Sequence, residues 1–149
     1  MNNKPIHSQR VEEISNECLH RFPKVPWLSS DEFLRRSEQE DWSIVDVRSQ
    51  REQAVSIIPG SLSGEEFEAR IEEHKNKHIL VYCTAGCHSG AYARTLRDRG
   101  LDAFNLRGGV LAWAHDDRPF VTLDGQPTRH VHVHGVGWDS LPPGYEAVG

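Results

Sequence analysis

One cysteine stands where a strand pattern gives way to a helical pattern. Residues 79–82 are four apolar residues in a row, which is typical of a buried strand in a parallel sheet. Cys83 follows directly, and a short run of small residues (84–86) leads into a helical pattern that ends near Gly100. A thiol in that position faces the amides of a loop and of a helix N-terminus, and these favour the thiolate. We therefore expect chemistry at Cys83, although a cysteine that only packs at a strand end would give the same local pattern.

The loop after Cys83 carries a second thiol and an imidazole. Cys87 lies four residues further on, where it either resolves a Cys83 persulfide or sulfenate into a disulfide or points outward without a role. Loops of this kind turn their backbone amides inward, which favours the outward orientation of Cys87. His88 follows, and it is either a titrating cation at the site or a helix-start residue without a substrate contact.

The composition bounds the class of protein. The chain has 149 residues, 37% hydrophobic and 26% charged, with a formal net charge of −5, which suits one well-cored domain. A mildly acidic chain argues against nonspecific binding of nucleic acid and against attraction to anionic membranes. No apolar run reaches the roughly 18 residues of a membrane span, and the first ten residues lack the apolar core of a signal peptide. We therefore expect a cytoplasmic protein.

The cysteine count supports the same expectation. The chain has three cysteines, of which Cys18 lies far from the other two in sequence. Three cysteines form no disulfide framework. In a reducing compartment a catalytic or redox role for one of them is favoured over a structural bridge.

Helical and strand patterns alternate up to residue 115. Helical spacing of apolar residues over 8–22 predicts an amphipathic helix at the N-terminus. Strand patterns follow in turn at 43–47, 79–82 and 102–106. Three capping boxes, each a Ser followed three residues later by a Glu, predict helix starts at Ser29, Ser49 and Ser63. This alternation predicts an α/β fold with a mostly parallel sheet.

The pattern changes at Asp116. Beyond it, turn residues dominate and only residues 128–134 have the alternation of a strand. We therefore divide the chain into an N-terminal helical extension (1–24), an α/β domain (25–115) and a C-terminal extension (116–149) that wraps the same domain.

Three histidines in the C-terminal extension could in principle bind a metal ion. In a strand, His130, His132 and His134 would share one face, and closely spaced histidines can hold zinc. The alternative, which we favour, is the solvated face of an edge strand whose valines pack inward. We accordingly expect no metal at this site.

Four pieces of the chain, in one order, resemble the rhodanese family of single-domain sulfurtransferases. They are IVDVR (44–48) with Glu52, IPGSL (58–62), VYCTAG (81–86) and NLRGGVLAW (105–113). The resemblance implies a three-layer α/β fold with a five-stranded, mainly parallel sheet. It also implies that Cys83 takes up a sulfane sulfur as a persulfide and passes it to a nucleophile, without a cofactor.

The same resemblance implies which residues form the site. Loop residues would surround the outer sulfur, namely Thr84, Ala85, Gly86, Cys87, His88 and Ser89. Arg48 and Arg107, at strand ends, are candidate anion contacts, and Asp46 would support the loop; for all three a structural role is an equal alternative. The chain departs from the family at one position, because His88 stands where the family loop usually has Arg.

We therefore expect a sulfurtransferase that moves sulfur from thiosulfate, a persulfide or a polysulfide to a thiol or to cyanide. The expected partners are a small-molecule donor and a thiol acceptor, with a sulfur-carrier protein as a further candidate. The missing Arg predicts weak activity on thiosulfate. It also keeps open a rhodanese-fold binding or regulatory module without catalysis. A cysteine-dependent phosphatase or arsenate reductase fits less well, since no guanidinium would clamp its oxyanion.

Overall fold

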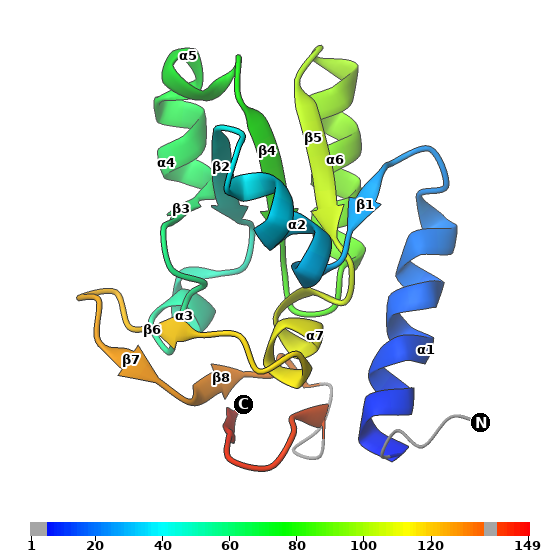
Figure 1. The fold of residues 1–149 in the computed structure, drawn as a ribbon, viewed down its shortest axis with the longest axis vertical. Helices are drawn as coiled ribbons and strands as arrows, with labels where there is room; N and C mark the ends of the chain where they lie inside the picture. Colours follow the sequence, from blue (N-terminus) through cyan, green and yellow to red (C-terminus); the bar gives the residue numbers. More distant parts are fainter. Residues whose placement is uncertain (1–5, 136–139) are drawn as a thin grey trace.

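A five-stranded parallel sheet forms the centre of the computed structural model, which describes residues 6–135 and 140–149 (Figure 1). The strand order is β1-β5-β4-β2-β3, and every neighbouring pair is parallel. The strands are Trp27–Leu28 (β1), Trp42–Asp46 (β2), Ser61–Ser63 (β3), His78–Tyr82 (β4) and Asp102–Leu106 (β5). The central β4 is apolar and buried from Ile79 to Tyr82, as a strand covered on both faces must be.

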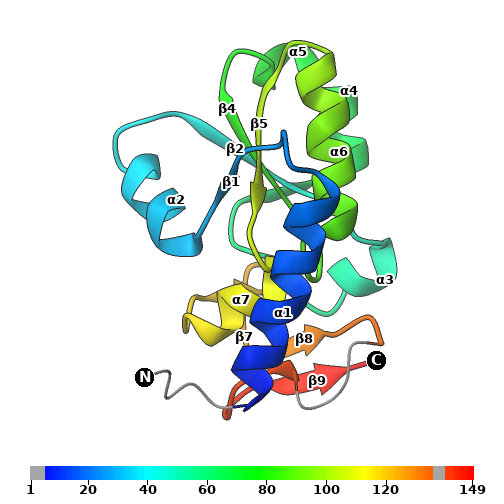
Figure 2. The ribbon, with the colours of Figure 1, turned by 90° about the vertical axis from the view of Figure 1, so that its right-hand side faces the viewer.

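Helices cover both faces of this sheet (Figure 2). Helix α2 (Ser30–Ser37) lies on one face, and α4 (Gly64–Ala69), α5 (Ile71–His74) and α6 (Cys87–Asp98) lie on the other. Each face has its own apolar core: Phe33 and Leu80 belong to the first, and Phe67, Val81 and Leu96 to the second. The short helices α3 (Gln50–Gln53) and α7 (Gly109–His115) follow β2 and β5. The predicted three-layer α/β fold is confirmed.

The three predicted capping boxes are all present. Ser29, Ser49 and Ser63 each accept a hydrogen bond from the backbone N–H of the Glu three residues later, and that Glu accepts one from the Ser backbone. Two otherwise unpaired donors are satisfied at each helix start, which typically stabilises a helix by about 1 kcal/mol. Local sequence therefore fixes where α2, α3 and α4 begin.

The predicted N-terminal helix is also present, as α1 (Ile6–Arg21), and it packs against α6 and α7 (Figure 2). Val11, Ser15 and Cys18 are the buried residues of its inner face. The Ser15 hydroxyl donates to the Val11 carbonyl, so this small polar group is satisfied within the helix. Helix α1 thus lies beside the end of α6 at which the Cys83 loop enters it.

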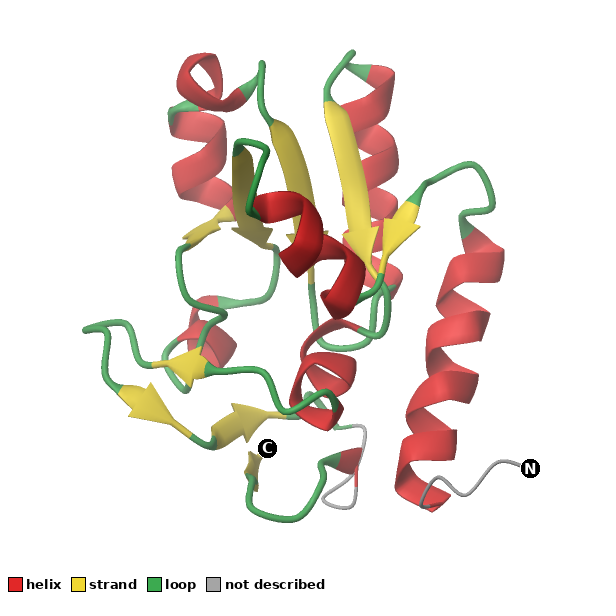
Figure 3. Cartoon of the chain, in the orientation of Figure 1, coloured by secondary structure: helices red, strands yellow, loops and turns green. Residues whose placement is uncertain are grey.

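The chain beyond α7 contains short strands (Figure 3). β6 (Phe120–Val121) pairs antiparallel with β7 (Pro127–Thr128), and β8 (His130–His132) pairs parallel with β9 (Glu146–Val148). The prediction of one strand over 128–134 is wrong. The stretch divides at Arg129 because its two parts pair with different partners, and it turns at His134, whose φ is +47°. No helix in residues 6–135 and 140–149 is long and apolar enough to cross a membrane.

Gly109, at the start of α7, allows this helix to approach the Cys83 loop. The backbone N–H groups of Val110 and Leu111 donate to the carbonyls of Cys83 and Thr84, at 3.0 and 3.2 Å. A Cβ atom at Gly109 would lie 2.3 Å from the Cys83 carbonyl oxygen, and the residue has a φ of +54°. Only glycine satisfies both requirements without strain.

Gly109→Ala is therefore expected to lower the free energy of unfolding by about 2 kcal/mol or more, through backbone strain and overlap with the loop. Denaturant unfolding measures this loss. Gly64→Ala is the control, since a Cβ there would meet nothing within 4 Å and Gly64 has no positive φ. Equal stability of the two variants would contradict the close approach of α7 to the loop.

Candidate functional site

The Cys83 sulfur lies at the end of β4 and accepts hydrogen bonds from the loop that follows. The backbone N–H groups of Gly86 and Ser89 donate to Sγ at 3.2 and 3.4 Å, and the Ser89 hydroxyl lies 3.3 Å from it. Gly86 has a φ of +111°, and the 12-residue helix α6 begins directly after it. Two amides and the positive end of a helix dipole therefore meet at one thiol, which stabilises negative charge on its sulfur.

Asn105, at the end of β5, fixes this loop from behind. Its amide Nδ2 donates to the Gly86 carbonyl at 2.9 Å, and its Oδ1 accepts from the Ser89 hydroxyl at 2.7 Å. Asn105 is 1% exposed. The sequence analysis missed this role, although a polar residue inside an otherwise apolar strand was the available signal.

A pocket of about 400 Å³ opens beside Cys83. Its walls come from α1, from the segment after β2, from the Cys83 loop and from the C-terminal extension. The lining residues are Ile14, Cys18, Val47, Arg48, Ser49, Glu52, Cys83, Thr84, Ala85, Cys87, His88 and His134. Of the predicted loop residues, Thr84, Ala85, Cys87 and His88 thus line the pocket together with Cys83. The backbone N–H groups of Gly86 and Ser89 donate to the Cys83 sulfur.

The favoured interpretation of Cys87, an outward side chain without a role, is wrong. Cys87 forms a disulfide with Cys18 of α1, with an S–S distance of 1.99 Å and a Cα–Cα distance of 4.7 Å. Cys83 is the free cysteine and is buried. Neither alternative for Cys87 anticipated this bond, because the two residues are 69 positions apart and only the packing of α1 on α6 brings them together.

Arg48 lines the pocket but is held in an internal ion pair. Its guanidinium donates to both carboxylate oxygens of Asp46, at 2.8–3.2 Å, and to the Ser56 carbonyl at 2.7 Å. Burial alone would lower the pKa of Arg48, but the hydrogen bonds and charge of Asp46 raise it. Asp46 also accepts from the Arg48 backbone N–H and from the Tyr82 hydroxyl. The structural alternative holds for this pair: Asp46 and Arg48 join β2 to β4.

Arg107 is not among the residues that line the pocket. Its guanidinium donates to Asn16 Oδ1 of α1 at 2.8 Å and lies over the Trp27 ring, 5.5 Å from the centroid. The prediction of an anion contact at Arg107 is therefore not supported by its position. The residue follows β5 and serves instead to hold α1 against the sheet edge at β1.

Glu52 connects three parts of the pocket wall. It caps α3 through Ser49, accepts from the Thr84 hydroxyl at 3.1 Å and lies 3.5 Å from His134 Nδ1. Burial raises its pKa, but hydrogen bonds from the Ser49 side chain and backbone and from Thr84, with the nearby His134, outweigh burial and lower it. A buried carboxylate thus forms part of the pocket wall, which the sequence did not predict.

The histidines of the C-terminal extension do not share one face. His130 is exposed and lies 3.0 Å from Glu146, whereas His132 is buried and accepts a hydrogen bond from the His134 backbone N–H. His134 leaves the strand and packs its ring edge-on to His88, with centroids 6.1 Å apart. No group of three His, Cys, Asp or Glu side chains within residues 6–135 and 140–149 is arranged to hold a metal ion.

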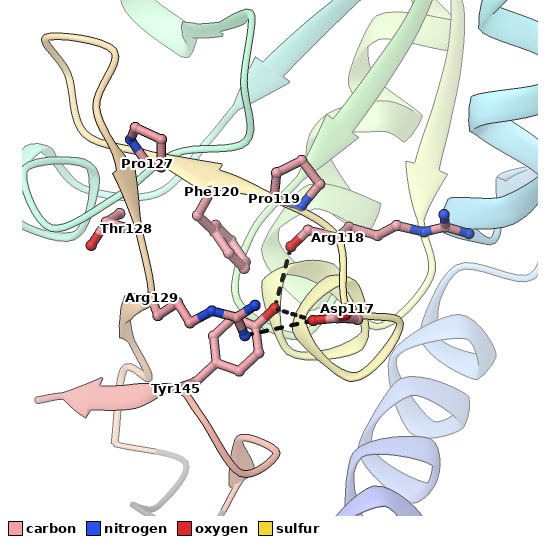
Figure 4. Close-up of a pocket in the computed structure, with 8 residues that line it drawn as sticks. All are labelled: Asp117, Arg118, Pro119, Phe120, Pro127, Thr128, Arg129 and Tyr145. Atoms are coloured by element: carbon pink, nitrogen blue, oxygen red, sulfur yellow. Dashed lines mark hydrogen bonds and ion pairs between the residues drawn. The ribbon is translucent and has the colours of Figure 1, made fainter.

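A second pocket, of about 370 Å³, lies beside the end of α7 (Figure 4). Its polar groups satisfy one another: the Tyr145 hydroxyl donates to Asp117 Oδ1, and Arg129 pairs with Asp117 and stacks on the Tyr145 ring. A cysteine is not among its lining residues. The pocket at Cys83 is therefore the candidate active site.

Comparison with known proteins identifies the family. A family model described as a rhodanese-like domain matches residues 29–116. This range contains the sheet strands from β2 to β5, the Cys83 loop and α7. The chain belongs to the rhodanese-like domain family, and the resemblance seen in its sequence is confirmed.

Individual relatives cover different shares of the chain. A sulfurtransferase from Allochromatium vinosum is 33% identical over 95 residues, covering 61% of this chain and 89% of the relative. A tRNA uridine(34) hydroxylase from Acinetobacter baylyi is 24% identical over 151 residues; the match spans about half (48%) of its length. A solved rhodanese-like domain protein from Staphylococcus aureus is 28% identical with a TM-score of 0.52, covering 60% of this chain and 91% of that one.

The contacts of Glu52 generate a prediction about stability and pH. Because its pKa is lower in the folded chain than in the unfolded chain, ionised Glu52 stabilises the fold above the ordinary glutamate value of about 4.3. This contribution is lost as the pH falls through the lower, folded value. Glu52→Gln should reduce the free energy of unfolding at pH 7. In this variant the free energy of unfolding should also fall less steeply as the pH drops below about 4.3.

Denaturant titrations between pH 7 and pH 3 measure both effects. Glu65→Gln, which removes an exposed carboxylate from α4, is the control. The same pH slope in Glu52→Gln as in the unsubstituted protein would contradict the account of this carboxylate.

Proposed function

We propose that this protein is a sulfurtransferase in which Cys83 carries the transferred sulfur. The observation that supports this most directly is the convergence of two loop amides and the α6 N-terminus on the Cys83 sulfur. Membership of the rhodanese-like domain family and a relative named as a sulfurtransferase support the same reaction class.

The reaction has two steps. The Cys83 thiolate attacks the outer sulfur of thiosulfate, a persulfide or a polysulfide, and sulfite or a thiolate leaves. The amides of Gly86 and Ser89 stabilise the sulfur anions formed on the way. An acceptor, a thiol in the cell or cyanide in an assay, then attacks the outer sulfur of the Cys83 persulfide and regenerates the thiolate. All the groups that act in these steps belong to the chain or to its substrates.

The charges around the pocket favour donors other than dianionic thiosulfate. Arg48 is neutralised by Asp46, His88 replaces the usual loop Arg, and the Glu52 carboxylate lines the pocket wall. A carboxylate repels a dianion, and no fixed guanidinium is free in the loop to offset it. A persulfide or polysulfide therefore suits this pocket better than thiosulfate does. The same lack of a guanidinium in the loop argues against a phosphatase.

Thiocyanate formation from cyanide tests this function. We expect turnover with polysulfide to exceed turnover with thiosulfate, and Cys83→Ser to abolish both, because no other thiol occupies the amide site. His88→Arg should raise the thiosulfate rate about tenfold, since one charge-assisted hydrogen bond contributes about 1.5 kcal/mol.

Thr95→Arg is the matched control for added charge, because this exposed residue lies two turns further along α6. Full activity of Cys83→Ser would overturn the proposed function. A thiosulfate rate above the polysulfide rate, or the same gain from Thr95→Arg as from His88→Arg, would overturn the account of donor choice.

A further inference from the structure

We propose that Cys18 and Cys87 are a resolving dithiol that reduces the Cys83 persulfide and releases its outer sulfur as hydrogen sulfide. The disulfide in the structure is then the product of this reaction. The proposal rests on the proposed function, because it requires that Cys83 first acquires a sulfane sulfur. It adds a second fate for that sulfur, besides transfer to an external acceptor.

The positions of the three cysteines support this reaction. Cys18, Cys83 and Cys87 all line the same pocket of about 400 Å³. Cys87 lies between Gly86 and Ser89, the two residues whose amides bind the Cys83 sulfur. We therefore expect the outer sulfur of a Cys83 persulfide to lie close to Cys87, the residue that would attack it. A disulfide that served only to fasten α1 would not need to lie in the wall of the active site.

Helix α1 is also held in place by contacts other than the disulfide. Reduction of the disulfide therefore leaves the two thiols side by side. Val11 of α1 belongs to an apolar core, and Arg107 donates to Asn16. Just beyond the helix, Cδ2 of the Phe22 ring lies only 2.6 Å from the position that a Cβ of Gly90 would take, so the ring packs closely on α6. Cys18 itself is 2% exposed. A buried dithiol held by packing on both sides is prepared to close again.

The environments of the two thiols support this order of attack. Cys87 is the first residue of α6, whose N-terminal dipole favours a thiolate. Cys18, in the last turn of α1, is the buried partner that attacks second. The thiol nearer the persulfide is thus also the one whose environment favours the attacking form.

The reaction balances in two exchanges. The Cys87 thiolate attacks the outer sulfur of the Cys83 persulfide; a bond forms between that sulfur and Cys87, the bond to Cys83 breaks, and Cys83 leaves as a thiolate. The Cys18 thiolate then attacks Cys87 Sγ, forming the disulfide and expelling hydrosulfide, which takes up a proton. Two thiols lose two electrons, and the sulfane sulfur gains them. An external dithiol reductant resets the pair.

This role also accounts for a disulfide in a chain of this class. In reducing compartments disulfides are usually transient and catalytic, whereas lasting structural bridges belong to oxidising ones. A bond that forms once in each cycle and is then reduced needs no oxidising compartment. The disulfide and the expectation of a cytoplasmic protein are then compatible.

Sulfide release in a single cycle tests the proposal. The full chain is reduced, freed of reductant and incubated with excess thiosulfate until no further change occurs. Since thiosulfate leaves as sulfite, sulfide can come only from sulfur carried by the protein. Reduced protein should release one equivalent of sulfide and finish about 30 Da heavier, having lost about 2 Da to the disulfide and gained about 32 Da as a new Cys83 persulfide.

The same chain with its disulfide already formed is the matched control. It should gain about 32 Da and release no sulfide, as should reduced Cys87→Ser, in which the first exchange cannot occur. Since the control needs no substitution, the test survives a variant that fails to fold. Sulfide release from the oxidised chain, or a reduced chain that gains 32 Da, keeps both thiols open to alkylation and releases no sulfide, would overturn the relay. If no form gains sulfur from thiosulfate or, in a parallel incubation, from polysulfide, the proposed function itself fails.

Discussion

The site depends on the two hydrogen bonds by which the buried Asn105 side chain holds the Cys83 loop. One of these bonds fixes the Gly86 carbonyl, and the other fixes the Ser89 hydroxyl. With both ends of the loop held, the amides of the same two residues point at the Cys83 sulfur. These N–H groups already point at the sulfur before the reaction begins. They need not reorient as negative charge develops there, and such preorganised donors are effective for that reason. The sheet contributes by placing β5 beside β4, so that Asn105 and Cys83 end at the same edge.

Three charged side chains, Arg48, Asp46 and Glu52, lie near this loop. Arg48 would be a strong anion contact, but Asp46 pairs with it and the two are buried as a unit between β2 and β4. Removing one partner of such a pair would leave an uncompensated buried charge, which is strongly destabilising. Asp46 and Arg48 therefore stabilise the fold as a pair. Glu52 is the carboxylate that lines the pocket, so it adds negative charge to the pocket wall.

Local sequence predicted much of the fold, because the deciding interactions are short in range. Ser49 caps a helix through a residue three positions away, and the apolar run of β4 is visible by itself. The place of Cys83, between a buried strand and a helix, was also predictable, because the apolar run before it and the helical pattern after it are both local. The family resemblance added the number of strands in the sheet and the expectation of a persulfide.

The contacts across the pocket were not predictable in the same way. Cys18 meets Cys87 only because α1 packs on α6, and His134 reaches Glu52 only because the chain turns after β8. Arg107 appeared to face the loop, yet α1 supplies Asn16 as a nearer partner. Each of these contacts joins segments that are distant in sequence, so spacing and periodicity carry no information about them.

Peptide mapping tests the central claim, that Cys83 carries the sulfur, most directly. Protein with its disulfide intact is treated with one equivalent of polysulfide, alkylated and digested with trypsin without reduction. We expect peptides 11–21 and 78–94 to remain joined through Cys18 and Cys87 and to carry one extra sulfur, about 32 Da, at alkylated Cys83. A joined pair without extra sulfur, or extra sulfur located on any other residue, would contradict the account.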